Sequence, residues 1–241
     1  MNDKVQGVVI QTIRYGDTSL IVKVFTRGFG LKSYMVKGAF SHTSKNRAAF
    51  FQPLSIINYV EAGKPNGNAL GYLKDVQLDY TYQTLPFEMN KSAIMMFVSE
   101  LLSKTLVGQE QNDDFYSFVV KSLQWLDLVD SGYANFPLFF TLELTRFLGF
   151  YPKLGYSEGY CFDMIEGVFV PDYPLHPYYL GASAAALLFQ FMGKGIDEAC
   201  QVQLNVNQRR ELMDGLMLFM RLHAPVMKTF QSHEVLKVVL Q

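Results

Sequence analysis

Residues 7–39, GVVIQTIRYGDTSLIVKVFTRGFGLKSYMVKGA, form three apolar runs that are separated by two turn signals. The turns, at residues 16–17 and 28–30, contain glycine, which adopts the backbone conformations that tight turns need. In the middle run, residues 19–26, apolar side chains alternate between two faces, and this period of two is typical of a β-strand. The stretch therefore predicts three consecutive strands.

Two further runs of the same kind follow, LSIINYVEA at 54–62 and LGYLKDVQL at 70–78. The turn signal GKPNGN, at 63–68, separates them, whereas the link that precedes them, at 40–53, is longer than a hairpin turn. Five short strands with a longer connection after the third fit a small closed barrel of the OB type. An SH3-like barrel is an alternative that the pattern alone leaves open.

Beyond the fifth run the apolar period changes from that of strands to that of helices. Residues 150–180 interrupt the helical pattern with many Gly, Pro and Tyr, and they predict a small hairpin that turns at residues 166–167. We therefore predict an α+β protein, with an OB-type barrel domain at 1–80 and a mostly helical domain at 81–241 that contains this insertion. The helical patterns cover residues 86–108, 112–130, 135–150, 182–193, 205–225 and 232–240.

The charges are distributed unevenly, although the net charge of the whole chain is only −1. Residues 1–80 hold 10 Lys and Arg against 5 Asp and Glu, whereas residues 81–241 hold 11 against 17. Within the basic part, residues 25–53 contain no carboxylate, and their cations are interleaved with Phe and Tyr. Single-stranded nucleic acids are bound by cations along the phosphates and by flat side chains on which bases stack. The first domain is therefore predicted to bind nucleic acid.

Eight residues of this region are the predicted nucleic-acid site. The loop at 40–47 lacks carboxylates, as expected if its neighbour is a polyanion. Phe50 and Phe51 are predicted to pack in or at the end of the barrel core. The predicted phosphate-binding cations are Lys23, Arg27, Lys32, Lys37, Lys45 and Arg47, and the predicted stacking rings are Phe29 and Tyr34.

Motifs of the common catalytic sites are absent from the sequence. It contains no phosphate-binding loop, no His pair at metal-ligand spacing and no nucleophile elbow. The N-terminus shows no signal peptide, and the two cysteines do not form a disulfide framework, so we expect a cytoplasmic protein. The uncharged stretch at 173–193 is broken by Pro and Gly, and no membrane association is predicted.

The N-terminal pattern closely resembles the N-terminal domain of the RecO family of bacterial recombination mediators. The resemblance weakens through the helices, where LELTRFLGFYP at 142–152 and FDMIEGVF at 162–169 are similar to later parts of that family. The pieces that carry it, in order, are GVVI at 7–10, YGDTSLIV at 15–22, FTR at 25–27, GLKS at 30–33, VKGA at 36–39, Lys45 with Arg47, and QPL at 52–54.

The resemblance implies an OB barrel followed by a helical domain, and a protein that is not an enzyme. It also implies binding to single- and double-stranded DNA, annealing of complementary strands, and partnership with RecR and with single-strand-binding protein. Together these proteins load RecA onto gapped DNA, so RecA is an indirect partner. A bacterial, nucleoid-associated location follows from the same resemblance. Two alternatives remain: an adaptor whose barrel binds an acidic protein partner, and a hydrolase whose catalytic centre is assembled from distant residues.

Many members of that family hold zinc in the middle insertion with four cysteines in two C-x-x-C pairs. Here Cys161 stands alone before FDMIEGVF, and the second pair would fall at 171–176, PDYPLH, where no cysteine occurs. Structural zinc needs four good ligands, and Cys161 with His176 supplies at most two. We therefore expect no cofactor and no metal, with apolar packing in place of the zinc, and Cys200 is expected to pack a helix.

The acidic helical part is expected to capture the tail of single-strand-binding protein. That tail is acidic and ends in Phe, so it calls for an apolar pocket edged by cations. The basic residues on apolar helices that are candidates for this edge are Lys121, Arg146, Arg209, Arg210 and Arg221.

Overall fold

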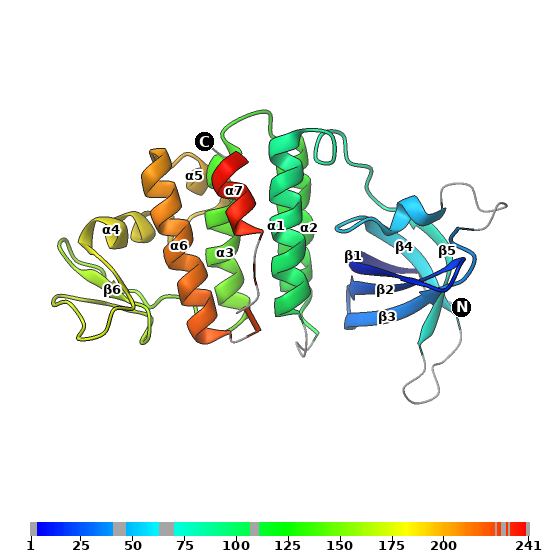
Figure 1. The fold of residues 1–241 in the computed structure, drawn as a ribbon, viewed down its shortest axis with the longest axis horizontal. Coiled ribbons are helices and arrows are strands. Elements are labelled where there is room, and N and C mark those ends of the chain that lie inside the picture. Colours follow the sequence, from blue (N-terminus) through cyan, green and yellow to red (C-terminus); the bar gives the residue numbers. More distant parts are fainter. Residues whose placement is uncertain are drawn as a thin grey trace. The chain divides into compact units, whose positions relative to one another are not determined.

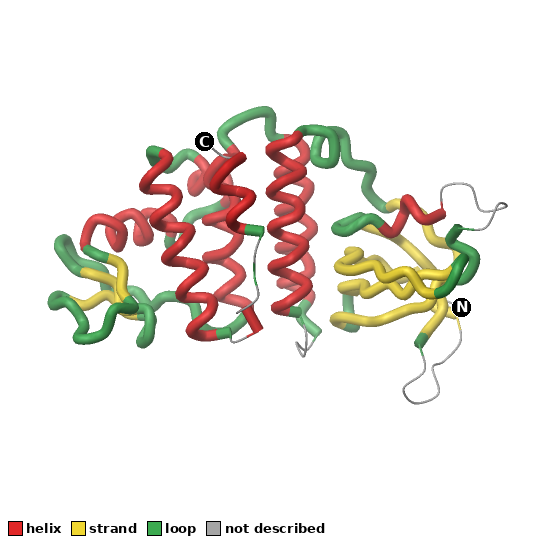
Figure 2. Tube along the Cα trace, viewed as in Figure 1, coloured by secondary structure: helices red, strands yellow, loops and turns green. Residues whose placement is uncertain are grey.

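The computed structural model describes residues 4–40, 47–62, 70–106, 111–224, 226–227, 230 and 232–239. A barrel of strands comes first in the chain and helices follow it. A small sheet interrupts the helices, after the third helix and before the fourth (Figures 1 and 2). The strands are β1 (Lys4–Tyr15), β2 (Ser19–Thr26), β3 (Gly30–Val36), β4 (Ile56–Ala62), β5 (Gly71–Leu78), β6 (Cys161–Asp163), β7 (Val168–Val170) and β8 (Tyr179–Leu180). The α-helices are α1 (Met89–Thr105), α2 (Asp113–Leu128), α3 (Phe136–Phe147), α4 (Ala182–Phe191), α5 (Ile196–Cys200), α6 (Val206–His223) and α7 (His233–Val239).

The first five strands close into a barrel in the order β1-β2-β3-β5-β4. Neighbouring strands run antiparallel except β3 and β5, which are parallel. This confirms the predicted OB-type barrel and excludes the SH3-like alternative. The long link after β3 ends in a short 3-10 helix, Arg47–Phe51, as the chain returns to β4.

One face of every barrel strand fills the interior. Val22, Tyr34 and Tyr59 are almost wholly buried there, together with Phe51 from the 3-10 helix. Phe50 packs against this core at its edge, so the prediction for both phenylalanines is confirmed. Close packing of large β-branched and aromatic side chains supplies most of the stabilisation of such a barrel.

A β-bulge in β1 changes which residues of that strand face outward. Val9 pairs with Val24 before the bulge and Gln11 pairs with Lys23 after it, so Ile10 is an extra residue. An extra residue reverses the in-and-out alternation of the rest of its strand. Even-numbered residues such as Val8 therefore face outward before the bulge, and Gln11, Ile13 and Tyr15 face outward after it.

The chain divides into two compact units, and the first combines the barrel with part of the helices. It comprises residues 1–87 and 99–127, and therefore includes α2. Phe25 of β2 contacts two rings of α2: its ring centroid lies 5.2 Å from that of Phe115 and 5.6 Å from that of Tyr116. Helix α2 thus covers the outer surface of the barrel at Phe25, which is only 1% exposed.

The second unit comprises residues 88–98 and 128–241, so α1 is shared between the units. The boundaries of these units differ from the predicted domains, because α2 groups with the barrel. Within the second unit α3 and α6 pack together, and the predicted insertion folds into the small sheet β7-β6-β8. Its hairpin turns where predicted, since Gly167 has a positive φ of 66° and Asp163 Oδ1 accepts hydrogen bonds from two turn amides.

Each predicted helical segment contains an α-helix, whereas the short elements β8 and α5 were not predicted. Asn112 caps α2, because its Oδ1 accepts a hydrogen bond of 2.8 Å from the amide of Phe115. Strand β8 and helix α5 have only two and five residues, too few to show a period in sequence. Among the described residues, no helix combines the length and the apolar composition that crossing a bilayer requires.

Candidate nucleic-acid interface

Eight side chains of four strands form an open surface on the barrel, which we call the outer face. Pairing across the strands sets its rows: Lys23 lies between Gln11 and Ser33, and Ile21 lies between Ile13 and Met35. The outer face consists of Gln11, Ile13 and Tyr15 of β1, Ile21 and Lys23 of β2, Ser33 and Met35 of β3, and Tyr72 of β5.

The outer face combines exposed rings with apolar side chains and cations. Tyr15 is 55% exposed and Tyr72 is 41% exposed, so both present a ring to solvent. The half-buried Ile21 and Met35 form an apolar floor between them, and none of the eight residues is acidic. Such a surface can contact flat apolar groups while tolerating a nearby negative charge.

Two exposed cations of the barrel sit over aromatic rings: Lys37, which follows β3 beside the outer face, and Arg14, which alternates with the outward residues of β1. Lys37 Nζ lies 4.9 Å from the centre of the Tyr72 ring, and Arg14 Cζ lies 5.2 Å from the centre of the Phe40 ring. The Lys37 and Arg14 side chains are exposed, as is the Phe40 ring. A cation over a ring is attracted by the ring's quadrupole, which holds it beside a stacking platform.

The structure brings together only some of the predicted cations. Lys23 belongs to the outer face and Lys37 lies at its edge, but Lys32 shares the inward side of β3 with Tyr34. Lys23 and Lys32 therefore do not share a face of the barrel. Lys32 closes the mouth of the barrel, where its Nζ lies 3.6 Å from Glu61 Oε2.

The turn between β2 and β3 carries two more of the predicted residues. Phe29 is 57% exposed, and Lys32 Nζ lies 4.3 Å from the centre of its ring. Arg27 is exposed in the same turn, beside Gly28, whose amide donates a 3.0 Å hydrogen bond to Asp113 of α2. An acidic side chain thus lies next to the turn that presents Arg27.

Tyr34 is a correction to the predicted site. It is 1% exposed, and its hydroxyl accepts a 2.9 Å hydrogen bond from the hydroxyl of Tyr59 inside the barrel. Burial raises the pKa of Tyr34 to about 12. A ring enclosed in this way offers no face to a base, so we withdraw Tyr34 as a stacking residue. Of the remaining predicted residues, Lys45 lies outside the described residues, and only the backbone of Arg47 is described.

Sequence reasoning missed four residues of the barrel surface: Arg14, Tyr15, Phe40 and Tyr72. Strict alternation along β5 places Tyr72 outward, and this signal was available in the sequence. The outward orientation of Tyr15 could not be predicted, because it depends on the β-bulge and the composition of the sequence does not indicate a bulge. Phe40 comes beside the first turn through the hydrogen bond that its amide donates to the carbonyl of Thr18, 3.2 Å away.

The five helical cations lie on three helices, α2, α3 and α6. Lys121 is exposed and belongs to the first unit, whereas the four arginines belong to the second. Arg209 and Arg221 lie 12 residues apart on α6, which is about 18 Å along a helix. Arg209 and Arg221 are therefore separate candidates for the edge of a pocket, and the assignment of each of the five residues stays a prediction.

Three of the arginines have partners inside the second unit. Arg146 donates two hydrogen bonds to Glu143, of 2.9 and 3.1 Å, and its Cζ lies 3.7 Å from the Tyr151 ring centre. Arg209 donates to Asn135 Oδ1 at 3.0 Å, and burial lowers its pKa. Arg221 donates to the carbonyl of Met217 at 3.2 Å.

The residues of the insertion do not fit a structural zinc ion. The thiol of Cys161 donates to the carbonyls of Val170 and Asp172, at 3.5 and 3.2 Å, and burial raises its pKa. His176 Nε2 lies 3.3 Å from Asp163 Oδ2, a contact that also stays within the insertion. In the part of the chain that the structure describes, Cys161 belongs to no group of three potential metal ligands.

The fold defines a class: a protein with an OB-type barrel followed by a mostly helical region. Residues 1–82 match the family described as "Recombination protein O N terminal", and residues 86–229 match "Recombination protein O C terminal". The protein named DNA repair protein RecO of Flavobacterium psychrophilum is 35% identical to this chain over 240 residues, 99% of each. The protein of the same name from Phocaeicola vulgatus is 33% identical over 238 residues, 98% of each.

The chain therefore belongs to the RecO family of DNA repair and recombination proteins. Proteins of this family are recombination mediators and not enzymes, in agreement with the missing catalytic motifs. The predicted family and fold class are confirmed.

Proposed function

We propose that this chain binds single- and double-stranded DNA through the outer face of its barrel. Tyr15 and Tyr72 stack on bases, and Lys23, Lys37 and Arg14 contact phosphates. The observation that carries the proposal is the coincidence of the exposed rings of Tyr15 and Tyr72 with Lys23 and the neighbouring Lys37. None of the eight residues of this barrel face is acidic. Membership of a family of DNA repair proteins supports the choice of DNA as the ligand.

The proposed interface extends towards the turn between β2 and β3. Phe29 is exposed there and Arg27 lies beside it, so a strand that leaves the outer face meets a further ring and a further cation. Lys45 and Arg47 remain proposed phosphate ligands on the basis of the sequence. Lys32 contributes less than the other cations, because Glu61 already offsets its charge.

The same surface accounts for annealing of complementary strands. Cations that neutralise one backbone also lower the repulsion that a second backbone meets. Stacking leaves the Watson–Crick edges of the bases accessible, so a bound strand is able to pair. We propose that annealing proceeds in this way, in the cytoplasm and at the nucleoid.

We further propose that the chain acts with RecR and with the acidic tail of single-strand-binding protein, and thereby assists loading of RecA. These partners are proposed from the family resemblance. We also propose that the insertion holds no zinc, because the Cys161 thiol is engaged by backbone carbonyls and has no fellow ligands among the described residues.

A salt series with a fluorescent single-stranded oligonucleotide tests the proposed interface on the full chain. Contacts from Lys23, Lys37 and Arg14 alone give a slope of log K against log salt of about −2, because each neutralised phosphate of a single strand contributes about −0.7. The Lys23→Glu, Lys37→Glu variant should bind much more weakly and show a slope reduced by about 1.4. Lys153→Glu makes the same change at an exposed residue of the second unit and serves as the control.

A protein-binding adaptor is the second candidate, because the apolar Ile13, Ile21 and Met35 also suit a peptide. A competition experiment separates the two functions. Oligonucleotide should displace an acidic peptide that is bound to the barrel, but not one that is held by the helices. An oligonucleotide slope that is unchanged in the Lys23→Glu, Lys37→Glu variant contradicts the DNA interface that we propose.

A further inference from the structure

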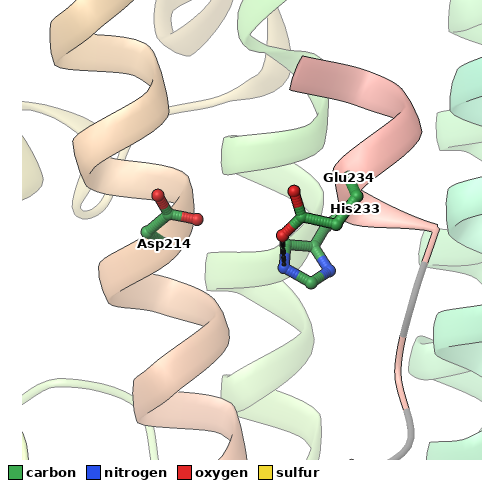
Figure 3. A group of neighbouring side chains, drawn as sticks. All are labelled: Asp214, His233 and Glu234. Atoms are coloured by element: carbon green, nitrogen blue, oxygen red, sulfur yellow. Dashed lines mark ion pairs between the residues drawn. The ribbon is translucent and has the colours of Figure 1, made fainter. Parts of the chain in front are cut away.

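Asp214, His233 and Glu234 form a cluster of potential metal ligands in the second unit (Figure 3). One ligand atom of each residue, an oxygen of each carboxylate and a nitrogen of the imidazole, lies within 4.8 Å of the other two. Asp214 comes from α6, whereas His233 and Glu234 begin α7. Within the described part of the chain, this is the one group of three such residues.

The imidazole of the cluster is held in place by aromatic packing. His233 is 6% exposed, and its ring stacks on that of Phe230 with 5.7 Å between the centroids. Phe230 in turn meets the ring of Phe97 edge to face, at 5.4 Å. His233 Nε2 lies 2.9 Å from Glu234 Oε1, while the carboxylates of Asp214 and Glu234 are exposed. A fixed nitrogen thus faces two carboxylates that solvent and ions can reach.

The ligand types in this cluster select for a particular kind of ion. Zinc is held by imidazole nitrogen and carboxylate oxygen at about 2.0–2.2 Å, which in a tetrahedron separates ligand atoms by about 3.4 Å. His233 Nε2 and Glu234 Oε1 are in direct contact at 2.9 Å, about 0.5 Å closer than that value, so they would separate slightly to admit the ion. The ligand atom of Asp214 lies within 4.8 Å of both. Mg²⁺ is a poor match, because it demands octahedral oxygen coordination and binds imidazole weakly.

We propose that Asp214, His233 and Glu234 bind one Zn²⁺ ion, with water as the fourth ligand. The ion joins α6 to α7, two helices whose ligands lie 19 residues apart in the chain. It compensates the two neighbouring carboxylates and links the start of α7 to α6. With three protein ligands and one water, the site differs from a closed structural site with four protein ligands. The site is distinct from the insertion, where Cys161 and His176 do not form a ligand set.

Zinc binding to the full-length protein, after removal of metals with EDTA, tests the proposal. Titration calorimetry with ZnCl₂ should show one ion per chain, and the melting temperature should rise with added ZnCl₂ but not with MgCl₂. The Asp214→Asn, Glu234→Gln variant changes exposed side chains, so it should fold and should bind zinc at least tenfold more weakly. Glu211→Gln removes an exposed carboxylate of α6 outside the cluster and should leave the affinity unchanged.

The two thiols require their own control, because cysteine also binds zinc. The Cys161→Ser, Cys200→Ser variant should retain binding, since burial raises the pKa of both thiols and keeps them protonated. Loss of zinc binding in this variant overturns the proposal. The proposal is also overturned if the unmodified chain does not bind zinc, or if the Asp214→Asn, Glu234→Gln variant binds zinc as tightly as the unmodified chain.

Discussion

Asp127 Oδ1, at the end of α2, accepts a 2.8 Å hydrogen bond from the backbone amide of Leu85. The same carboxylate accepts from the amides of Gln83 and Thr84 and from the hydroxyl of Tyr80, so it holds the segment through which the chain leaves the barrel. A carboxylate at a helix C-terminus is unfavourable by itself, because the helix dipole is negative there. The four donors outweigh this effect and fix the exit segment to α2.

The Asp127→Asn variant should lower the stability of the first unit by about 2–3 kcal/mol at pH 7, because hydrogen bonds to a buried charge are lost. Burial raises the pKa of Asp127, but the donated hydrogen bonds lower it by more, so the folded-state pKa lies below the usual value. The contribution is therefore complete above the unfolded-state pKa of about 3.9 and is lost as the pH falls through the folded-state pKa. Urea unfolding from pH 7 to pH 3 should show the gap between wild type and variant closing.

The exposed Asp130 provides the matched control for this measurement. Asp130→Asn should change the free energy of unfolding by less than about 0.5 kcal/mol, as is usual for surface substitutions. A gap between Asp127→Asn and wild type that stays constant down to pH 3 contradicts the role given to the ionised carboxylate.

The hydroxyl pair inside the barrel gives a second stability prediction. Tyr34→Phe removes the acceptor of the Tyr59 hydroxyl and should destabilise the barrel by about 1–3 kcal/mol, because a buried donor is left without a partner. Adding Tyr59→Phe removes that donor as well and should recover most of the loss. Chemical unfolding of the two single variants and the double variant measures the coupling. Purely additive losses would mean that the two hydroxyls do not stabilise one another.

The strands of the barrel could be predicted because each carries a local signal. Glycine turns and the alternation of β2 were sufficient for the fold, and the length of the link before β4 favoured the OB order that the structure has. The position of α2 against Phe25 could not be predicted in this way. A buried outward residue such as Phe25 looks the same in sequence whether a helix or a ligand covers it.

The candidate site was only partly predictable, because the number of basic residues does not show to which face of the barrel each side chain points. Pairing across β2 and β3 puts odd-numbered residues outward on both strands, so Lys23 faces outward and the even-numbered Lys32 faces inward. The bulge at Ile10 similarly decides that Tyr15 faces outward. Both facts depend on pairing between strands, which a count of basic and aromatic residues does not contain.

Tyr15 and Tyr72 are expected to be the stacking residues of the outer face. Tyr15→Ala and Tyr72→Ala should each weaken binding of a single-stranded oligonucleotide about tenfold, since one base stack contributes about 1–3 kcal/mol. Tyr15→Phe keeps the ring and should retain most of the affinity. Tyr173→Ala removes a ring that is 63% exposed in the second unit and serves as the control. Equal affinities for Tyr15→Ala and Tyr173→Ala, measured by fluorescence anisotropy, would exclude Tyr15 from the interface.

Glu61 is expected to restrain DNA binding, because it lies 3.6 Å from Lys32 at the mouth of the barrel. Glu61→Gln preserves the shape of the side chain and leaves the charge of Lys32 uncompensated. Affinity for a single-stranded oligonucleotide at low salt should then rise about two- to threefold, a modest change because both side chains are partly exposed to solvent. Glu158→Gln makes the same change in net charge at an exposed residue of the second unit and separates this local effect from the general one. An equal rise in both variants would show that Lys32 lies away from the bound strand, because only overall charge would then be acting.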